Sequence, residues 1–337
     1  MKDCNKDITN YHQDEVKLKS GQRNNLKSRR DANRNRLDKG LIKNEDPVPA
    51  ENVRQGSDAH GTTIQEPDNG YDIDDGAVFI KDDLKGKQGG DKTPQDAKRM
   101  VRDAVDDGAF KTPPEIKTNC VRVHYDDGPH VDIPVYRKTV DENDSEFYEL
   151  AGSVWRESDP KGVNSWFQNS LNARCESGKP QMRSLIQLFK SYCKCRPSYS
   201  LPSGFILSVL TDERYSGFND RFDRAFRDLM ISVRNRLNLD LSVQHPVVNE
   251  KLAEVDDPAC RKFRDLLSTS IAELEALDRS NCKRSQALKI WKKIFNNTTY
   301  FDVAISDAET EEKKSAAACV AATSVMVKPY GSNNICD

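Results

Sequence analysis

The stretch GYDIDDGAVF, residues 70–79, places three aspartates in a segment that otherwise has the pattern of a β-strand. Alternate residues of a strand share a face, so we expect Asp72 and Asp74 to point the same way while Ile73 points into the core. Two adjacent carboxylates repel each other, and a shared hard cation such as Mg²⁺ relieves that repulsion. A solvated strand end is the other interpretation, because Asp-x-Asp alone is a weak motif. Asp75 should face the other side and act in a turn or a cap.

A third carboxylate stands on a second expected strand. Asp132 lies between Val131 and Ile133, so it repeats the pattern of one acidic side chain opposite two apolar ones. The turn signal DDGP at 126–129 joins this strand to an alternating strand at 119–125. Three converging carboxylates suit two Mg²⁺ ions, with Mn²⁺ as a substitute, the arrangement used for in-line phosphoryl transfer. The predicted catalytic and metal-binding residues are therefore Asp72, Asp74 and Asp132.

Upstream, the segment VRQGSDAHGTTI contains Gly56 and Ser57. A Gly-Ser turn at the start of a helix offers backbone N–H groups and a hydroxyl to phosphate oxygens. Gly56 permits close approach of the backbone, and Ser57 can donate to a β- or γ-phosphate. Gly-Ser is common in loops. Followed by Asp-x-Asp on a strand and by a later aspartate, it forms a specific combination that predicts nucleotide binding.

The segments QGSDAHGT, YDIDDG and HVDIPVY resemble the polymerase-β-like nucleotidyltransferases. Within that group they are similar to the bacterial CD-NTases, the cGAS/DncV-like nucleotidyltransferases, and to DncV-like members most of all. The resemblance is strong over residues 55–136 and weaker through the helical half. It implies an α+β fold: a polymerase-β-like nucleotidyltransferase lobe, with a mixed β-sheet and helices, plus a C-terminal helical lobe.

The resemblance also implies a function. It indicates a template-independent enzyme that joins nucleoside triphosphates, ATP and GTP, into a cyclic di- or trinucleotide second messenger for anti-phage defence (CBASS). A ribose hydroxyl would attack an α-phosphate and release pyrophosphate. Asp72 and Asp74 would hold the two metals, and Asp132 would orient the hydroxyl and accept its proton.

Two more residues follow from the resemblance. SLIQLFKSYCK resembles the helix that offers a lysine to the donor triphosphate, here Lys190, and SLPSGFILSVL resembles the helix start that supplies a serine, here Ser203. Ser203 follows Pro202 at an expected helix N-terminus, where anions are favoured. A helix-surface lysine and a plain cap are the alternative interpretations. Together with Gly56 and Ser57, these residues make up the predicted nucleotide-binding set.

Along the chain we expect a basic N-terminal helical arm (1–48), a nucleotidyltransferase core (49–160), a helical lobe (161–305) and a mobile C-terminal tail (306–337). Residues 16–44 contain ten Lys or Arg against two Asp, and four leucines are spaced as the stripe of one long helix: Leu18, Leu26, Leu37 and Leu41. The segment is either an RNA-binding arm or a solvated helix packed on the body by its leucines. Absence of interleaved aromatic residues favours the second.

Further helices are expected from capping and periodicity. Thr93 caps a helix at 93–107. Apolar stripes predict helices at 163–171, 182–192, 218–233, 259–277 and 285–295. After Ser306 the periodicity is lost, which indicates the tail.

Composition excludes several classes of protein. A net charge of −2 and a pI near 6.3 give no case for specific DNA binding. The nine cysteines contain no C-x₂-C pair, which disfavours a zinc site. No apolar run approaches a membrane span, and the N-terminal residues have no apolar signal core. We therefore expect a soluble, cytoplasmic protein whose partners are nucleoside triphosphates and, at the C-terminal tail, regulators from a defence operon.

Two other functions remain open. An enzyme of the same fold could transfer a nucleotide to RNA or protein, as a toxin does, with residues 16–44 holding the target. The chain could instead be an interaction protein whose aspartates bind Ca²⁺. The spacing of an EF-hand loop is absent, and the carboxylates come from distant segments, which argues against the last possibility.

Overall fold

The computed structural model describes residues 1–66, 69–86 and 89–326. Eight strands form one sheet: β1 (Glu51–Gln55), β2 (Asp72–Ile80), β3 (Glu115–Ile116), β4 (Val121–His124), β5 (His130–Ile133), β6 (Val135–Val140), β7 (Glu146–Ala151) and β8 (Trp155–Glu157). Two short strands form a separate hairpin: β9 (Val243–Gln244) and β10 (Lys251–Ala253).

Helices accompany the sheet and continue beyond it. The first half of the chain contains α1 (Asn5–Tyr11), the π-helical turn η1 (His12–Val16), α2 (Ser20–Lys43), α3 (Gly56–His60), the 3₁₀ turn η3 (Lys81–Asp83) and α4 (Pro94–Val105). The second half contains α5 (Pro160–Asn172), α6 (Gly178–Lys194), α7 (Gly204–Arg214), α8 (Phe222–Leu239), α9 (Pro258–Leu274), the 3₁₀ turn η4 (Glu275–Asp278), α10 (Arg284–Phe295) and α11 (Thr298–Met326). The predicted α+β fold class is confirmed.

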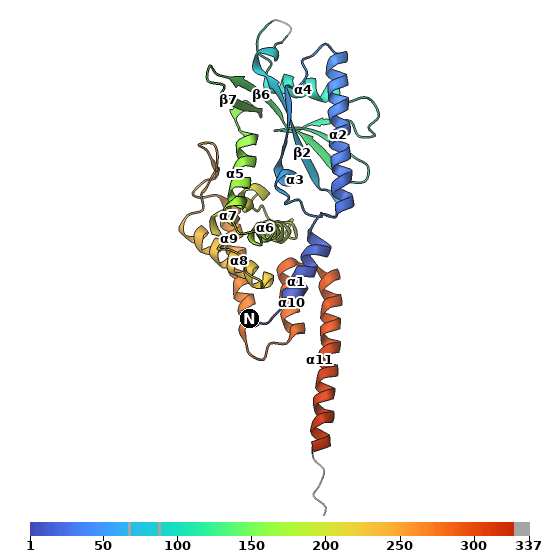
Figure 1. Ribbon diagram of the computed structural model, residues 1–337, viewed down its shortest axis with the longest axis vertical. Coiled ribbons are helices and arrows are strands. Elements are labelled where there is room, and N and C mark those ends of the chain that lie inside the picture. Colours follow the sequence, from blue (N-terminus) through green and yellow to red (C-terminus); the bar gives the residue numbers. More distant parts are fainter. Residues whose placement is uncertain (67–68, 87–88, 327–337) are drawn as a thin grey trace, which may run out of the picture.

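Strand β2 organises the sheet. It pairs antiparallel with β1 and parallel with both β5 and β6, which follow each other with only Pro134 between them. The expected hairpin of β4 and β5 is present, with Val123 opposite Val131. The sheet is therefore mixed. Figure 1 shows α2 and α4 with the sheet in one lobe and α5 to α10 in the other.

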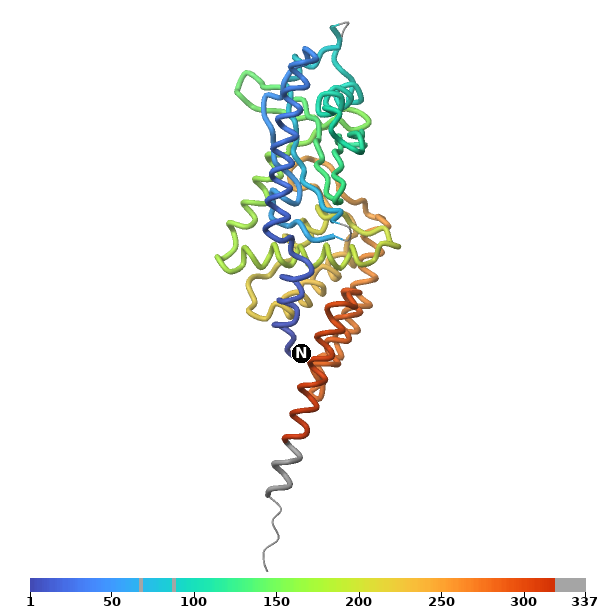
Figure 2. The backbone as a smooth tube through the Cα atoms, turned by 90° about the vertical axis from the view of Figure 1, so that its right-hand side faces the viewer, coloured from blue at the N-terminus to red at the C-terminus, as the bar shows by residue number. Residues whose placement is uncertain are grey.

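The two faces of β2 have different neighbours. Ile73, Ala77 and Phe79 are fully buried in a core that also contains leucines of α2 and apolar residues of α4. Leu26, Leu37 and Leu41 are buried there, so α2 packs on the sheet lobe by its leucine stripe. Figure 2 shows the backbone of this helix running along that lobe. The expected packing of this helix on the body by its leucines is thus confirmed. Leu18 is also buried but precedes the helix.

Asp75 also points to the α2 face, but its predicted role in a turn or cap is wrong. Its carboxylate accepts two hydrogen bonds from the Arg34 guanidinium of α2, at 2.6 and 2.5 Å, and its side chain is only 4% exposed. Asp75 raises the pKa of Arg34. A bidentate hydrogen-bonded partner of opposite charge offsets part of the cost of burying a carboxylate. The pair therefore fastens α2 to the strand that carries Asp74.

Residues 1–48 do not form a single arm. Ile8, Tyr11 and Val16 lie in the core of the helical lobe, whereas α2 lies on the sheet lobe. Burial of apolar side chains explains why these two parts of residues 1–48 lie in different lobes. The residues before α2 carry apolar side chains of their own, which pack against apolar residues of α8 and α10. The boundaries of the predicted segments are otherwise untested and stay predictions.

The helical lobe matches the expected apolar stripes with two corrections. Phe218 was expected in a helix face, but it precedes α8 and is 50% exposed. The expected mobile tail is wrong for residues 306–326, because α11 continues to Met326 and projects beyond the lobe (Figure 1). Residues 327–337 lie outside the described residues. No helix in the part of the chain that the structure describes is long and apolar enough to cross a bilayer.

Two glycines of α2 should respond oppositely to substitution by alanine. A Cβ at Gly40 would lie 1.9 Å from the carbonyl oxygen of Ala104 in α4, whereas a Cβ at Gly21 would meet nothing within 4 Å. We expect Gly40→Ala to lower the free energy of unfolding by about 1–3 kcal/mol and Gly21→Ala to raise it by about 0.5–1 kcal/mol. Urea denaturation measures both; equal effects would contradict the close α2–α4 crossing.

Removal of Arg34 should leave a buried charge. We expect Arg34→Met to destabilise the protein by about 2–3 kcal/mol, because Asp75 would lose its partner while Arg34 itself is partly solvated. Lys39→Met, on an exposed position of the same helix, is the matched control and should change stability by less than about 0.5 kcal/mol. Similar values for both variants would show that the pair has no role in holding α2 on β2.

Candidate active site

The turn at Gly56 brings the backbone against the Asp74 carboxylate. Gly56 opens α3 with φ +65°, and a Cβ there would lie 2.0 Å from Oδ2 of Asp74. Any other residue would be strained in the left-handed region and would also clash. The Ser57 hydroxyl lies 3.0 Å from the Thr63 hydroxyl. The expected helix start at Gly56-Ser57 is therefore present and adjoins the Asp-x-Asp strand.

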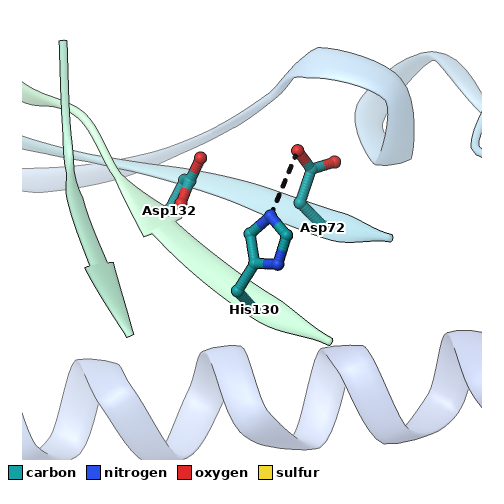
Figure 3. Close-up of side chains that lie close together, drawn as sticks. All are labelled: Asp72, His130 and Asp132. Carbon is teal, nitrogen blue, oxygen red and sulfur yellow. Dashed lines mark ion pairs between the residues drawn. The ribbon is translucent and has the colours of Figure 1, made fainter. Parts of the chain in front are cut away.

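The strand register places four side chains on one sheet face. In the parallel pair of β2 and β5, Asp72 lies opposite His130 and Asp74 lies opposite Asp132. Ligand atoms of Asp72, His130 and Asp132 all lie within 4.8 Å of one another, and we call these three residues the metal-ligand cluster (Figure 3). Asp74 lies beside it, next to Gly56. The structure thus brings the three predicted carboxylates together and adds a histidine.

An arginine holds Asp132 in place. Arg122 on β4 lies opposite Asp132 on β5 and donates from Nε and Nη2 to its two carboxylate oxygens, both at 2.7 Å. This bidentate pair fixes the orientation of the carboxylate, and it raises the pKa of Arg122. Each carboxylate oxygen retains a free lone pair for another donor or a cation.

Sequence reasoning did not identify His130 and Arg122. His130 precedes Asp132 by two positions, so strand alternation alone places it on the same face, and that signal was available. The pairing of Arg122 with Asp132 can be predicted only when the register of the β4–β5 hairpin is known.

Electrostatics at Asp74 favour a cation. Burial raises the pKa of Asp74 well above its ordinary value, and the charges of Asp72 and Asp132 raise it further. Carboxylate oxygens are suitable ligands for Mg²⁺ or Mn²⁺. The residues therefore fit a divalent metal, because a bound cation would relieve the repulsion that opposes ionisation.

The helical lobe contributes Lys190 and the start of α7. Lys190 Nζ donates to the carbonyl and the hydroxyl oxygens of Thr62, at 3.1 and 3.2 Å, so it is not a free surface lysine. Burial lowers its pKa to about 8, and Asp72 and Asp74 act in the opposite direction. Ser203 caps α7 by accepting from the N–H of Ile206 at 3.3 Å. Gly204 is so close that a Cβ there would lie 2.7 Å from Cε of Lys190.

Helix α6 reaches the segment that follows α3 through three side chains. Arg183 donates to the carbonyl of His60 at 2.9 Å, Gln187 donates to the carbonyl of Thr63 at 3.0 Å, and Lys190 contacts Thr62. These positions are spaced by four and three residues, so they lie on one face of the helix. The two lobes therefore meet at this segment.

All of the predicted site residues line one cleft of about 1310 Å³ between the sheet and the helical lobe: Gly56, Ser57, Asp72, Asp74, Asp132, Lys190 and Ser203. Arg122 lines it as well, and aromatic or apolar side chains such as Tyr136, Phe205 and Leu252 cover part of its wall. A volume of this size accommodates more than one small ligand. The arrangement combines carboxylates for a metal with a Gly-Ser turn, a lysine and a helix N-terminus suited to phosphate.

A mixed sheet with a Gly-Ser turn, Asp-x-Asp on the central strand and a third aspartate on the neighbouring strand defines a polymerase-β-like nucleotidyltransferase lobe. Comparison with known proteins shows which nucleotidyltransferases this chain is similar to. Residues 50–136 match the family model described as the nucleotidyltransferase domain of cyclic GMP-AMP synthase DncV-like proteins. A c-di-GMP synthase of Roseivirga ehrenbergii is 24% identical over 262 residues, which span 68% of this chain and 69% of that protein.

Solved structures share the fold over most of this chain. Apo DncV of Vibrio cholerae superposes with a TM-score of 0.68 at 17% identity, over 88% of this chain and 95% of that chain. DncV of Escherichia coli with bound 3′-deoxy GTP gives 0.66 at 16% identity, over 87% and 96%. The Vibrio cholerae cyclic AMP-GMP synthase in complex with the linear intermediate pppA(3′,5′)pG gives 0.68 at 17% identity, over 88% and 97%. Residues 50–136 therefore match a DncV-like nucleotidyltransferase domain, and the chain as a whole has the DncV fold.

The raised pKa of Asp74 predicts that Asp74→Asn stabilises the metal-free protein. Because the ionised form is disfavoured in the fold, the penalty is fully present above the folded-state pKa, decreases as the pH falls below that value, and disappears below the unfolded-state pKa. We expect a gain of about 1 kcal/mol at pH 7, or about 2 °C in Tm, which shrinks toward acidic pH. Thermal melts with chelator measure this difference.

Asp75→Asn is the matched control, on the same strand with the same change of side chain. It should destabilise the protein, because Asp75 is already paired with Arg34. Addition of Mg²⁺ should raise Tm of the unsubstituted protein more than that of Asp74→Asn. A metal-free Asp74→Asn protein that melts below the unsubstituted one at pH 7 would contradict the repulsion.

Proposed function

We propose that this protein is a template-independent nucleotidyltransferase that joins ATP and GTP into a cyclic di- or trinucleotide. The observation that carries the proposal is that Asp72, Asp74 and Asp132 line one cleft together with Ser57, Lys190 and Ser203, groups from both lobes that are suited to phosphate. The names of the similar proteins support it, since one is a c-di-GMP synthase and another is a cyclic AMP-GMP synthase solved with a linear dinucleotide.

Each residue has a proposed part in binding the donor nucleotide. The Ser57 hydroxyl and the adjacent backbone N–H groups donate to phosphate oxygens, and the Lys190 ammonium neutralises part of the triphosphate charge. Ser203, at the N-terminus of α7, adds a hydroxyl and the positive end of the helix dipole. Contact of Lys190 with Thr62 holds its ammonium group beside the Gly-Ser turn.

The reaction that we propose is in-line displacement at the α-phosphate. A ribose hydroxyl of the acceptor attacks the α-phosphorus, the bond to the bridging oxygen breaks, and pyrophosphate leaves. Asp132, oriented by Arg122, positions the hydroxyl and accepts its proton. Asp72, Asp74 and Asp132 would hold a divalent metal, which would supply charge stabilisation at the phosphate and lower the pKa of the attacking hydroxyl. A second round, with the triphosphate of the linear product as donor, closes the ring.

We also propose a biological role, which follows from the resemblance to the CD-NTases. The cyclic product would act as a second messenger in anti-phage defence (CBASS), made in the cytoplasm where nucleoside triphosphates are present. Regulators from the same operon would act at the C-terminal tail, whose last residues, 327–337, lie outside the described part of the chain. In this proposal the exposed side chains of α2 do not bind a specific DNA sequence.

Incubation with radiolabelled ATP, GTP, CTP and UTP, singly and mixed, with Mg²⁺ or Mn²⁺ tests the proposal. We expect a small product that resists phosphatase and requires ATP, GTP or both. Label on added RNA or on protein would instead support the toxin-like transferase. Absence of any product with either metal would leave the proposed synthase without support.

The substitutions Asp72→Ala and Asp74→Ala should each lower the rate of product formation at least about 100-fold, because both carboxylates would hold the metal that stabilises charge at the reacting phosphate. Asp83→Ala, an exposed aspartate just beyond β2, is the control and should keep the full rate. Activity that survives in the first two variants would contradict the assignment of this site.

A further inference from the structure

His130 has a position in the site that the proposed mechanism does not use. The register of β2 and β5 puts it opposite Asp72, and strand alternation puts it on the same face as Asp132. It therefore occupies the fourth corner of a square whose other corners are the three carboxylates. Figure 3 shows its imidazole directed toward Asp72, with Nε2 at 3.9 Å from Oδ2.

Packing does not account for this imidazole. The ring is only 12% exposed, yet it makes no side-chain hydrogen bond to any residue in the described part of the chain. A separation of 3.9 Å from the Asp72 carboxylate is too long for a hydrogen bond. The neighbouring His124, whose ring lies 6.0 Å away, does have a partner, because its Nε2 lies 2.7 Å from Glu115.

The spacing suits two ligands of one ion. Metal–ligand bonds of about 2.1 Å place two ligand atoms of the same ion about 3.0 to 4.3 Å apart, according to the angle between them. The His130–Asp72 separation lies inside that range. The nearest oxygen of Asp132 completes a set in which every ligand pair lies within 4.8 Å.

We propose that His130 is a metal ligand and that the site consequently prefers Mn²⁺ to Mg²⁺. Mg²⁺ is a hard ion that selects oxygen, whereas imidazole suits divalent transition metals and Mn²⁺ accepts carboxylate and imidazole together. The inference rests on the proposed function for the presence of a metal at this site. It adds a nitrogen ligand to the carboxylates and assigns the preferred ion.

Electron spin-echo spectroscopy of the full chain loaded with Mn²⁺ tests the nitrogen ligand without any measurement of activity. We expect modulation from a directly coordinated ¹⁴N nucleus in the unsubstituted protein. His130→Gln should abolish it, and His124→Gln, the matched control on the adjacent strand, should leave it unchanged. Absence of the modulation in the unsubstituted protein overturns the proposal, whatever the variants do, and so does its persistence in His130→Gln.

Titration followed by the signal of free Mn²⁺, with competition by Mg²⁺, measures the preference. His130→Gln should lower Mn²⁺ affinity by about tenfold or more, since loss of even an indirect partner of a metal ligand costs roughly 10–100-fold. Mg²⁺ affinity should change much less, so the ratio of the two affinities falls. An unchanged ratio overturns the proposed preference.

The outcomes separate this inference from the proposed function. Formation of a cyclic product without nitrogen coordination would retain the synthase and remove His130 from the ligands. Nitrogen coordination without a cyclic product would retain the metal site and remove the synthase.

Discussion

The parallel pairing of β2 with β5 is the constraint on which the site depends. In this register Asp72 faces His130 and Asp74 faces Asp132, so residues about sixty positions apart in sequence become neighbours on one sheet face. A slip of one residue would turn Asp74 toward the core and Ile73 toward the cleft. Burial of Ile73 and Val131 opposes that slip, because apolar surface would be exposed and a carboxylate buried. Burial of the apolar residues thus also sets the positions of the carboxylates.

Concentrated negative charge must be compensated, and arginines on both faces of the sheet do so. Arg122 pairs with Asp132 on the cleft face, and Arg34 pairs with Asp75 on the α2 face. Asp74 has no such partner in the described part of the chain, and its pKa is raised by burial and by its acidic neighbours. The uncompensated charge is located where a metal is useful. A local loss of stability of this kind is a common feature of active sites.

The two lobes are joined through the segment after α3. Side chains of α6 hydrogen-bond its backbone at His60, Thr62 and Thr63, and His12 of the N-terminal π-helical turn pairs with Gln187 at 2.8 Å. The Gly-Ser turn is consequently supported by the helical lobe as well as by the sheet. Early residues of the chain, which form part of the helical core, strengthen the same junction.

Local patterns in the sequence determined most of the elements and one part of the site. Alternation identified which face of β2 carries Asp72 and Asp74. The Gly-Ser turn was recognised from its residue types, and the structure shows why glycine is needed there: φ is +65°, and a Cβ would meet the Asp74 carboxylate. Thr93 and Ser203 lie at the starts of their helices as expected. These signals depend on residues a few positions apart. The extent of α11 was missed, because a helix rich in alanine and charged residues has no apolar stripe to detect.

Only the tertiary structure decided which distant residues meet. The partnership of Arg122 with Asp132 requires the hairpin register, that of Arg34 with Asp75 requires the placement of α2, and that of Lys190 with Thr62 requires the docking of the two lobes. His130 was visible by spacing, but its distance from Asp72 depends on strand pairing. A sequence specifies side-chain chemistry and local periodicity, whereas ion pairs and metal sites depend on distances of a few ångströms that long-range packing sets.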